Sequence, residues 1–469
     1  MLPRPYYLRT LYFPVRRALT SSRRRQISVF AVILLIIVSI RLLTNHTKPE
    51  ETFGATVLVP PVKGALRFPG PPTYKKLWTW ERNLPQHNLD LPFPEGKNGR
   101  FVKFSVQVLR LGWNNCFNEI LMNTHLAYMS NRAYVFPPYY WTPDHYPWPR
   151  SQFLAREPTT PLNALISGPS VGGSWDEGDK APRAVSDAWF DVVCPRSERR
   201  IINTVDVKPN IGWAEGTDIF AHWQKILLEA PESCIEIVPA PWEVDNFPQV
   251  FDLWLWGSNR ILSLWESFSK SPTSRLLDTS PIVESAVARN KFLFLSRGPN
   301  STPQPRDPYQ RMLAMHVRRG DFSKSCENLA RYGSTYYSWN LLPFLPDSFT
   351  PLEEGHPDRL KKKVRDSRSD YLHASKEHHT LDVLYILTNE HDEWLDQLIA
   401  ALRKENWETI VTSHQLELDA EQIDVGMAVD MDIARRAAVF IGNGWSSFTS
   451  NIVHRRLIED KPPISCRFY

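Results

Sequence analysis

The fold is decided by a stretch near the middle of the chain, Met312-Leu313-Ala314-Met315-His316-Val317-Arg318-Arg319-Gly320-Asp321. Its apolar first four residues predict a buried strand, and its polar remainder predicts the loop at the carboxyl end, where open α/β sheets bind ligands. Two adjacent guanidiniums beside an imidazole are costly to pack unless an anion meets them, and the planar fork of arginine suits a phosphate. Arg318 and Arg319 could therefore neutralise a departing diphosphate, with Asp321 holding one guanidinium. A surface turn with an Arg–Asp pair is the structural alternative.

A second polar turn follows another predicted strand. The run Val439-Phe440-Ile441 ends in Gly442-Asn443-Gly444-Trp445-Ser446-Ser447-Phe448-Thr449, after which a helix is expected. The glycines permit close approach of a ligand to the backbone. The hydroxyls of this turn would lie at a helix amino terminus, which attracts anions. In one parallel sheet with the arginine loop, the turn would give a phosphate a second cradle.

The first half contains one predicted βαβ unit, with strands at 101–108 and 132–136 around a helix that includes 120–129. The strand-to-helix turn holds Gly112, Asn114 and Asn115, whose amides can hold a ribose or a phosphate. A purely structural helix cap is the alternative. From residue 139 to 270 the pattern is weak and tryptophans are scattered. Aromatic surfaces of this kind can bind glycans or peptides, and ordinary core packing is the alternative.

The second half continues as βα units. Strands are predicted at 381–387 and 409–412, and helices at 392–406 and 425–438. Asp430-Met431-Asp432 matches the DxD pattern that holds a metal nucleotide in other transferases, but it lies within a predicted helix, where two acids are ordinary. The histidines at 373, 378 and 379 neighbour a Lys/Arg-rich irregular stretch, which favours a surface cluster. We therefore expect no metal site.

The 469 residues suffice for two domains behind a membrane anchor. Residues 1–26 carry seven arginines and no acid, so the net charge of +4 leaves the remainder near neutral, and nothing favours nucleic-acid binding. Residues 27–43 predict a short single-pass span, and the positive-inside rule places the body in the lumen of the endoplasmic reticulum or Golgi as a type II protein. A cleaved signal peptide is the alternative. A Pro-rich stem at 44–99 and domains at 100–275 and 276–469 would follow.

All five cysteines lie beyond the predicted anchor, so two disulfides and one free thiol are possible in a lumenal body. The sequence leaves their pairing open. Glycosylation sequons begin at Asn45 and Asn300.

Taken together, the motifs resemble those of the GDP-fucose protein O-fucosyltransferase-like family, within the fucosyltransferase superfamily of GT-B enzymes. Three motifs carry the resemblance in the right order: Gly112-Trp113-Asn114-Asn115, His316-Val317-Arg318-Arg319-Gly320-Asp321, and Phe440-Ile441-Gly442-Asn443 with Ser446-Ser447-Phe448-Thr449. Thr388-Asn389-Glu390 is also similar. The resemblance implies an α/β fold of two Rossmann-like domains facing a cleft, GDP-fucose as donor, a protein or glycan acceptor, inversion at the anomeric carbon and no required metal.

The resemblance also implies roles for individual residues. Arg318 would bind the β-phosphate and stabilise the departing GDP, with His316 beside it and Arg319 as a helper. Residues of the first domain would contact the nucleotide, and Ser447 with Phe448 would hold phosphate and base. The candidate nucleotide-binding residues are Gly112, Asn114, Asn115, Arg318, Arg319, Asn443, Ser446, Ser447, Phe448 and Thr449.

The chain departs from the family pattern at three positions. Leu111 stands where some relatives have an acidic base, Phe117 where some have arginine, and Ala438 where some have an aspartate that contacts guanine. The nearest candidate catalytic carboxylates are Glu119 and Asp321. A membrane-anchored protein of the same fold that binds a nucleotide sugar or glycan without turnover is the main alternative. A transferase with another donor or acceptor is a third.

Overall fold

The computed structural model describes residues 70–107, 111–153, 158–241, 243–295, 307–319, 327–329, 331–349, 381–405 and 407–469. These residues belong to one compact unit, Leu66–Tyr469. The predicted tail, the anchor and residues 44–69 of the stem lie outside the described residues, as do Asp321, both sequons and the histidines at 373, 378 and 379. None of the helices in the described ranges combines the length and apolarity needed to cross a membrane.

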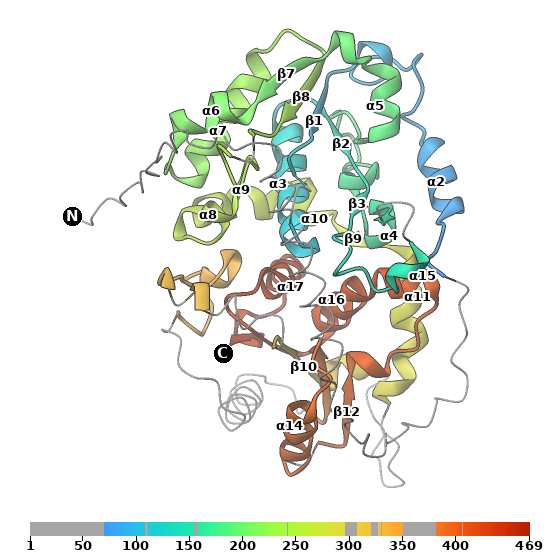
Figure 1. Cartoon of the computed structure of the whole chain (residues 1–469), viewed down its shortest axis with the longest axis vertical. Helices are drawn as coiled ribbons and strands as arrows, with labels where there is room; N and C mark the ends of the chain where they lie inside the picture. The colour runs from blue at the N-terminus through green and yellow to red at the C-terminus, as the bar shows by residue number, and fades with distance from the viewer. Residues whose placement is uncertain are drawn as a thin grey trace, which may run out of the picture. The chain divides into compact units, whose positions relative to one another are not determined.

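The first half is built on a five-stranded parallel sheet (Figure 1). Its order is β6-β2-β1-β8-β7, so β1 is central. The strands are β1 (Phe101–Phe104), β2 (Ala133–Phe136), β6 (Val185–Ser186), β7 (Arg200–Asn203) and β8 (Cys234–Val238). Helix α3 (Trp113–Met129) joins β1 to β2, as predicted, and is buried on nearly all sides. β1 is shorter than expected, because its pairing with β2 and β8 ends by Phe104.

The second half is built on another five-stranded parallel sheet, with the order β12-β11-β10-β13-β14. The strands are β10 (Met312–Val317), β11 (Val383–Thr388), β12 (Thr409–Thr412), β13 (Val439–Gly442) and β14 (Cys466–Phe468). The chain runs from β10 outward to β12 and then returns to β13 on the other side of β10. The strand order therefore reverses between β10 and β13, and in open α/β sheets this point binds ligands. The prediction of parallel α/β architecture is confirmed.

Shorter elements complete the unit. The remaining α-helices are α2 (Lys75–Arg82), α4 (Leu162–Leu165), α5 (Asp187–Val193), α6 (Thr204–Ile211), α7 (Gly216–Glu229), α8 (Leu253–Trp256), α9 (Trp265–Lys270), α10 (Pro272–Arg275), α11 (Pro281–Asn290), α14 (Glu393–Arg403), α15 (Ala420–Asp424), α16 (Gly426–Arg436) and α17 (Ser447–Ile458). Two antiparallel pairs join β3 (Tyr139–Tyr140) to β4 (Thr159–Thr160), and β5 (Ile166–Ser167) to β9 (Asp278–Thr279).

One prediction about β10 is wrong in detail. His316 and Val317 belong to the strand, opposite Leu387 and Thr388 of β11, and the loop begins only at Arg318. The cause is the length of β11, which continues the ladder for two residues past the apolar run. His316 is consequently fixed by the sheet rather than by a loop.

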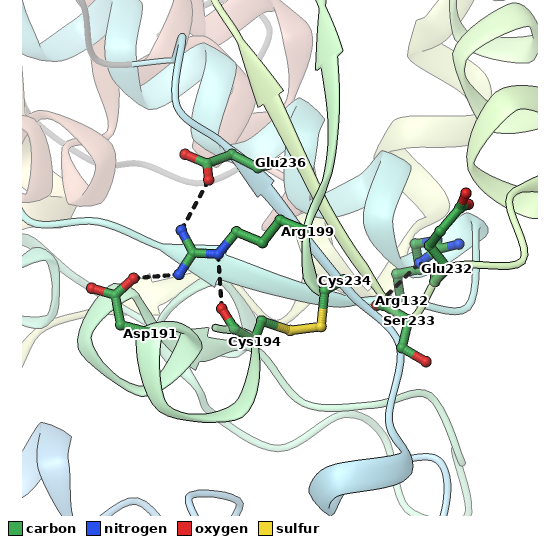
Figure 2. The surroundings of a disulfide bond; sticks show 8 residues. All are labelled: Arg132, Asp191, Cys194, Arg199, Glu232, Ser233, Cys234 and Glu236. Atoms are coloured by element: carbon green, nitrogen blue, oxygen red, sulfur yellow. Dashed lines mark hydrogen bonds and ion pairs between the residues drawn. A yellow bond between two sulfur atoms is a disulfide. The ribbon is translucent and has the colours of Figure 1, made fainter. Parts of the chain in front are cut away.

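A disulfide between Cys194 and Cys234 joins the end of α5 to the start of β8, with their Cα atoms 5.7 Å apart. Figure 2 shows Arg199 beside it, donating to the carbonyl of Cys194 and to the carboxylate of Glu236 at 2.9 Å. The bridge is one of those that the cysteine count permits. Cys116 and Cys466 are buried free thiols, and Cys326 lies outside the described residues.

Candidate functional site

The carboxyl end of β10 contacts the start of α17 through His316. Its Nδ1 atom lies 3.0 Å from Oγ1 of Thr449, and its ring meets the Phe448 ring edge to face at 4.8 Å. Its backbone carbonyl accepts a hydrogen bond of 2.9 Å from the hydroxyl of Tyr469. Burial, with the nearby charge of Arg318, lowers the pKa of His316 to about 3. The imidazole is therefore neutral at physiological pH and links the two polar motifs directly.

The β13–α17 turn is held by its own side chains. The Asn443 carboxamide accepts from the backbone N–H of Trp445 at 2.9 Å, and the Ser446 hydroxyl accepts from that of Phe448 at 3.2 Å. Ser446 is thus the N-cap of α17, which confirms that these hydroxyls lie at a helix amino terminus. Ser447 is half-buried, and its hydroxyl has no hydrogen-bond partner among the residues that the structure describes. It is available to an anion at this helix end.

The two glycines of the turn serve packing within the protein. A Cβ at Gly442 would lie 2.4 Å from the Thr449 methyl, and one at Gly444 would lie 2.4 Å from ring carbons of Tyr336. The sequence pattern predicts that their small size admits a ligand. The structure instead uses it to bring α17 and the Tyr336 ring against the backbone of the turn.

Tyr337 and Asn340, which no sequence motif indicated, form hydrogen bonds with this turn. The N–H of Tyr337 donates to the Gly444 carbonyl at 2.9 Å. The side-chain amide of Asn340 donates to the carbonyls of Gly444 at 2.9 Å and Ser446 at 3.3 Å. The Tyr337 hydroxyl donates to the Asn115 carboxamide at 3.1 Å. Tyr337 therefore connects the third motif to the first, and its sequence signal is no more than a local density of aromatic and amide residues.

The first motif also contacts α17 directly. The side-chain amide of Asn451 donates to the backbone carbonyl of Asn114 at 3.0 Å, although the two residues are 337 positions apart. Gly112, the N-cap of α3, is exposed, and a Cβ there would meet no atom within 4 Å. The amino-terminal turn of α3 is therefore placed against the second turn of α17. Residues from all three motifs come together here.

The arginines take different positions. Arg318 is partly exposed and is the first residue after β10. Arg319 is exposed, and its guanidinium stacks over the Trp394 ring at 4.3 Å, with Nε 3.8 Å from the Glu390 carboxylate. In this structure Arg319 is engaged beside α14, and Arg318 is the arginine adjoining the His316–Thr449 contact.

Glu119, on α3, is bonded to core side chains. Its carboxyl is buried and accepts from the Trp256 indole at 3.0 Å and from the Asn123 side-chain amide at 3.4 Å. Burial raises the pKa of Glu119 to about 8, so the group is mostly protonated at neutral pH. A buried, protonated carboxyl that is bonded to core side chains is poorly suited to accept a proton from an acceptor hydroxyl.

The two carboxylates of the DxD pattern bond to other side chains of the protein. Asp430 accepts from the Ser413 hydroxyl at 2.9 Å, and Asp432 pairs with Arg436 at 2.7 Å as well as with Arg435. The described residues contain no group of three or more His, Cys, Asp or Glu side chains arranged to hold a metal. The contacts of these two carboxylates account for them as structural residues of α16.

No family model and no curated protein matches the chain. Among solved structures, POFUT1 in complex with GDP-fucose is similar at 16% identity, over 80% of this chain and 98% of that one, with a TM-score of 0.45. NodZ alpha-1,6-fucosyltransferase soaked with GDP-fucose has 12% identity, coverage of 76% and 92%, and a TM-score of 0.36. A mutant of Arabidopsis thaliana FUT1 in complex with GDP has 13% identity, coverage of 82% and 74%, and a TM-score of 0.34.

Proposed function

We propose that the chain is a glycosyltransferase that moves fucose from GDP-fucose to a hydroxyl of a protein or glycan, with inversion and without a metal. The observation that carries the proposal is the contact between His316 and Thr449 at 3.0 Å. It joins the carboxyl ends of adjacent strands β10 and β13 at the reversal of strand order. Arg318 and the amino terminus of α17 thereby lie at one sheet edge, where a diphosphate can meet both.

The proposed reaction is a single displacement. An acceptor hydroxyl oxygen forms a bond to the anomeric carbon while the bond from that carbon to the β-phosphate oxygen breaks, and GDP departs with the electron pair. Arg318, the Ser447 hydroxyl and the backbone amides of α17 would stabilise the charge that develops on GDP. Asn114 and Asn115 would contact the nucleotide from the first half. Asp321 remains the candidate base, since Glu119 is buried.

The location is part of the proposal. We place the protein in the endoplasmic reticulum or Golgi membrane, anchored by residues 27–43, with domains 100–275 and 276–469 in the lumen. The Cys194–Cys234 disulfide supports an oxidising compartment.

The second candidate is a protein of the same fold that binds a GDP-sugar without turnover. It is favoured by Phe117, which is fully buried and stacks on Trp113 at 5.3 Å, so this position offers no guanidinium to a ligand.

The experiment that tests the proposal measures release of GDP from GDP-fucose by the full chain in EDTA, with and without glycoprotein and oligosaccharide acceptors. We expect acceptor-dependent release that Arg318→Ala reduces at least a hundredfold, while Arg196→Ala, at an exposed arginine elsewhere, leaves it unchanged. GDP binding without release would favour the binding protein. Failure to bind GDP would overturn both candidates.

A further inference from the structure

The described tryptophans between residues 139 and 270 differ widely in exposure. Those buried in the core include Trp223 and Trp256, which are 0% and 1% exposed. Trp213 and Trp254 instead remain 68% and 48% exposed. Core packing explains the buried tryptophans but leaves the exposure of Trp213 and Trp254 unexplained.

The exposed pair belongs to an array of four aromatic rings, which we call the aromatic array: Trp213, Phe247, Trp254 and Tyr332. Trp254 is its centre, with ring centroids 6.3 Å from Trp213, 5.9 Å from Phe247 and 6.4 Å from Tyr332. All three contacts are edge to face. Tyr332 is itself 65% exposed, so the array is contiguous and open to solvent.

Arg260 and Asp252 support the part of the array that contains Trp213 and Trp254. The Arg260 guanidinium lies 5.0 Å from the centre of the Trp213 ring, and it donates to the carbonyls of Ala214 at 2.8 Å and Trp254 at 3.2 Å. Asp252 caps α8 by accepting from the backbone N–H of Trp254 at 3.0 Å. These contacts order the backbone that carries Trp213 and Trp254 and pack one face of the Trp213 ring, which lowers the entropy lost on binding.

The two basic side chains Arg260 and Lys208, which lie beside the array, have partners within the protein. Arg260 bonds to backbone carbonyls, and Lys208 pairs with Asp245 at 2.7 Å and Asp252 at 2.9 Å. The array thus presents aromatic faces with little net charge. An uncharged ligand with flat apolar C–H faces fits this surface better than a charged peptide or a phosphate.

The array lies beside the candidate donor site. Two residues after Tyr332, the carbonyl of Ser334 accepts from the Trp445 indole of the β13–α17 turn at 3.0 Å. The hydroxyl of Thr335 donates to the carbonyl of Gly257, directly after α8, at 3.4 Å. The same segment therefore joins the aromatic array to the turn proposed to hold the diphosphate.

We infer that the aromatic array is the acceptor-binding surface and that the acceptor is a neutral oligosaccharide, whose pyranose rings stack on Trp213 and Trp254. This inference rests on the proposed function, because only a transferase has an acceptor. The binding of a sugar to the array can nevertheless be measured without any donor.

The test is isothermal titration of the full chain, in a detergent without a sugar head group, with cellotetraose, chitotetraose and mannotetraose. We expect at least one of these to bind, and Trp213→Ala and Trp254→Ala to weaken that binding tenfold or more. Trp80→Ala is the matched control, because Trp80 is 51% exposed on α2, outside the array. Trp213 is the more exposed of the two, so its variant keeps the test valid if Trp254→Ala fails to fold.

Titration with GDP on the same samples separates the two proposals. Chains that bind GDP but none of the three tetrasaccharides would overturn the inference and leave the proposed function standing. Sedimentation that shows a dimer lost in Trp213→Ala would also overturn it, because the occupant would then be a second copy of the chain. Sugar binding that all three tryptophan variants retain would place the sugar site elsewhere.

Discussion

At the scale of residues, His316 is a polar side chain that the sheet holds in a structural contact with α17. It stands near the carboxyl end of β10, its ring buried against Phe448 and its Nδ1 atom next to the Thr449 hydroxyl. Burial lowers the pKa of His316 to about 3, against about 6.5 for an unfolded histidine. The unfolded state therefore binds more protons between these two values. Below pH 6.5 this difference destabilises the folded chain increasingly as the pH falls, and above pH 6.5 it has no effect.

We predict that His316→Gln makes the free energy of unfolding less sensitive to acid. Between pH 6 and 4, the slope of the unfolding free energy against pH should become shallower by about 1.4 kcal/mol per pH unit. The reason is that the variant lacks the histidine whose pKa is lowered on folding. Urea unfolding at several pH values measures this slope. His145→Gln, at an exposed histidine, should leave the slope unchanged. A slope in His316→Gln as steep as in the wild type would show that His316 titrates normally in the folded chain.

At the scale of elements, Tyr337 joins the start of α3 to the β13–α17 turn. Its N–H bonds to Gly444, and its hydroxyl bonds to Asn115. Since Asn115 belongs to the first half of the chain and Gly444 to the second, Tyr337 positions the two sides of the proposed nucleotide site relative to each other.

We predict that Tyr337→Phe weakens GDP binding about fivefold to tenfold. It should lower the free energy of unfolding by about 2 kcal/mol, because the hydroxyl donates one hydrogen bond to Asn115 and accepts a longer one from Asn118 at 3.5 Å. Isothermal titration and urea unfolding measure the two effects. Tyr332→Phe removes the hydroxyl of an exposed tyrosine, and we expect it to leave both quantities unchanged. Unaltered GDP affinity in Tyr337→Phe would refute the positioning role.

At the scale of elements, part of the fold can be predicted from the sequence. Thr409–Thr412 is a strand with the predicted bounds, and β10, β11 and β13 are predictable because they contain continuous apolar runs. β6 and β14 escape prediction because they have only two and three residues, and β7 and β8 because polar residues bound or interrupt their apolar runs. Tyr337 and Asn340 escape it because their importance lies in partners distant in sequence. The burial of Glu119 against Trp256, 137 positions away, likewise cannot be read from periodicity.

At the scale of the whole molecule, the Cys194–Cys234 bridge closes a loop with a sequence separation of 40 residues. Chain-entropy arguments give a cross-link of this length a stabilising contribution of about 4 kcal/mol. We predict that the double variant Cys194→Ser/Cys234→Ser loses about that much free energy of unfolding.

Urea unfolding with and without dithiothreitol checks this prediction. The reductant should bring the wild type to the stability of the double variant and leave the double variant unchanged. A wild type that is as stable under dithiothreitol, together with an unimpaired double variant, would mean that the bridge does not stabilise the fold.

The central claim is that the carboxyl ends of β10 and β13 together form a metal-independent site for a GDP diphosphate. Isothermal titration of the full chain with GDP in EDTA tests it most directly, with Arg318→Ala and the exposed-arginine control Arg196→Ala measured in parallel. We predict binding by the wild type and by Arg196→Ala, and a loss of at least tenfold in Arg318→Ala. A well-folded wild type that does not bind GDP, or binding that Arg318→Ala leaves intact, would contradict the claim.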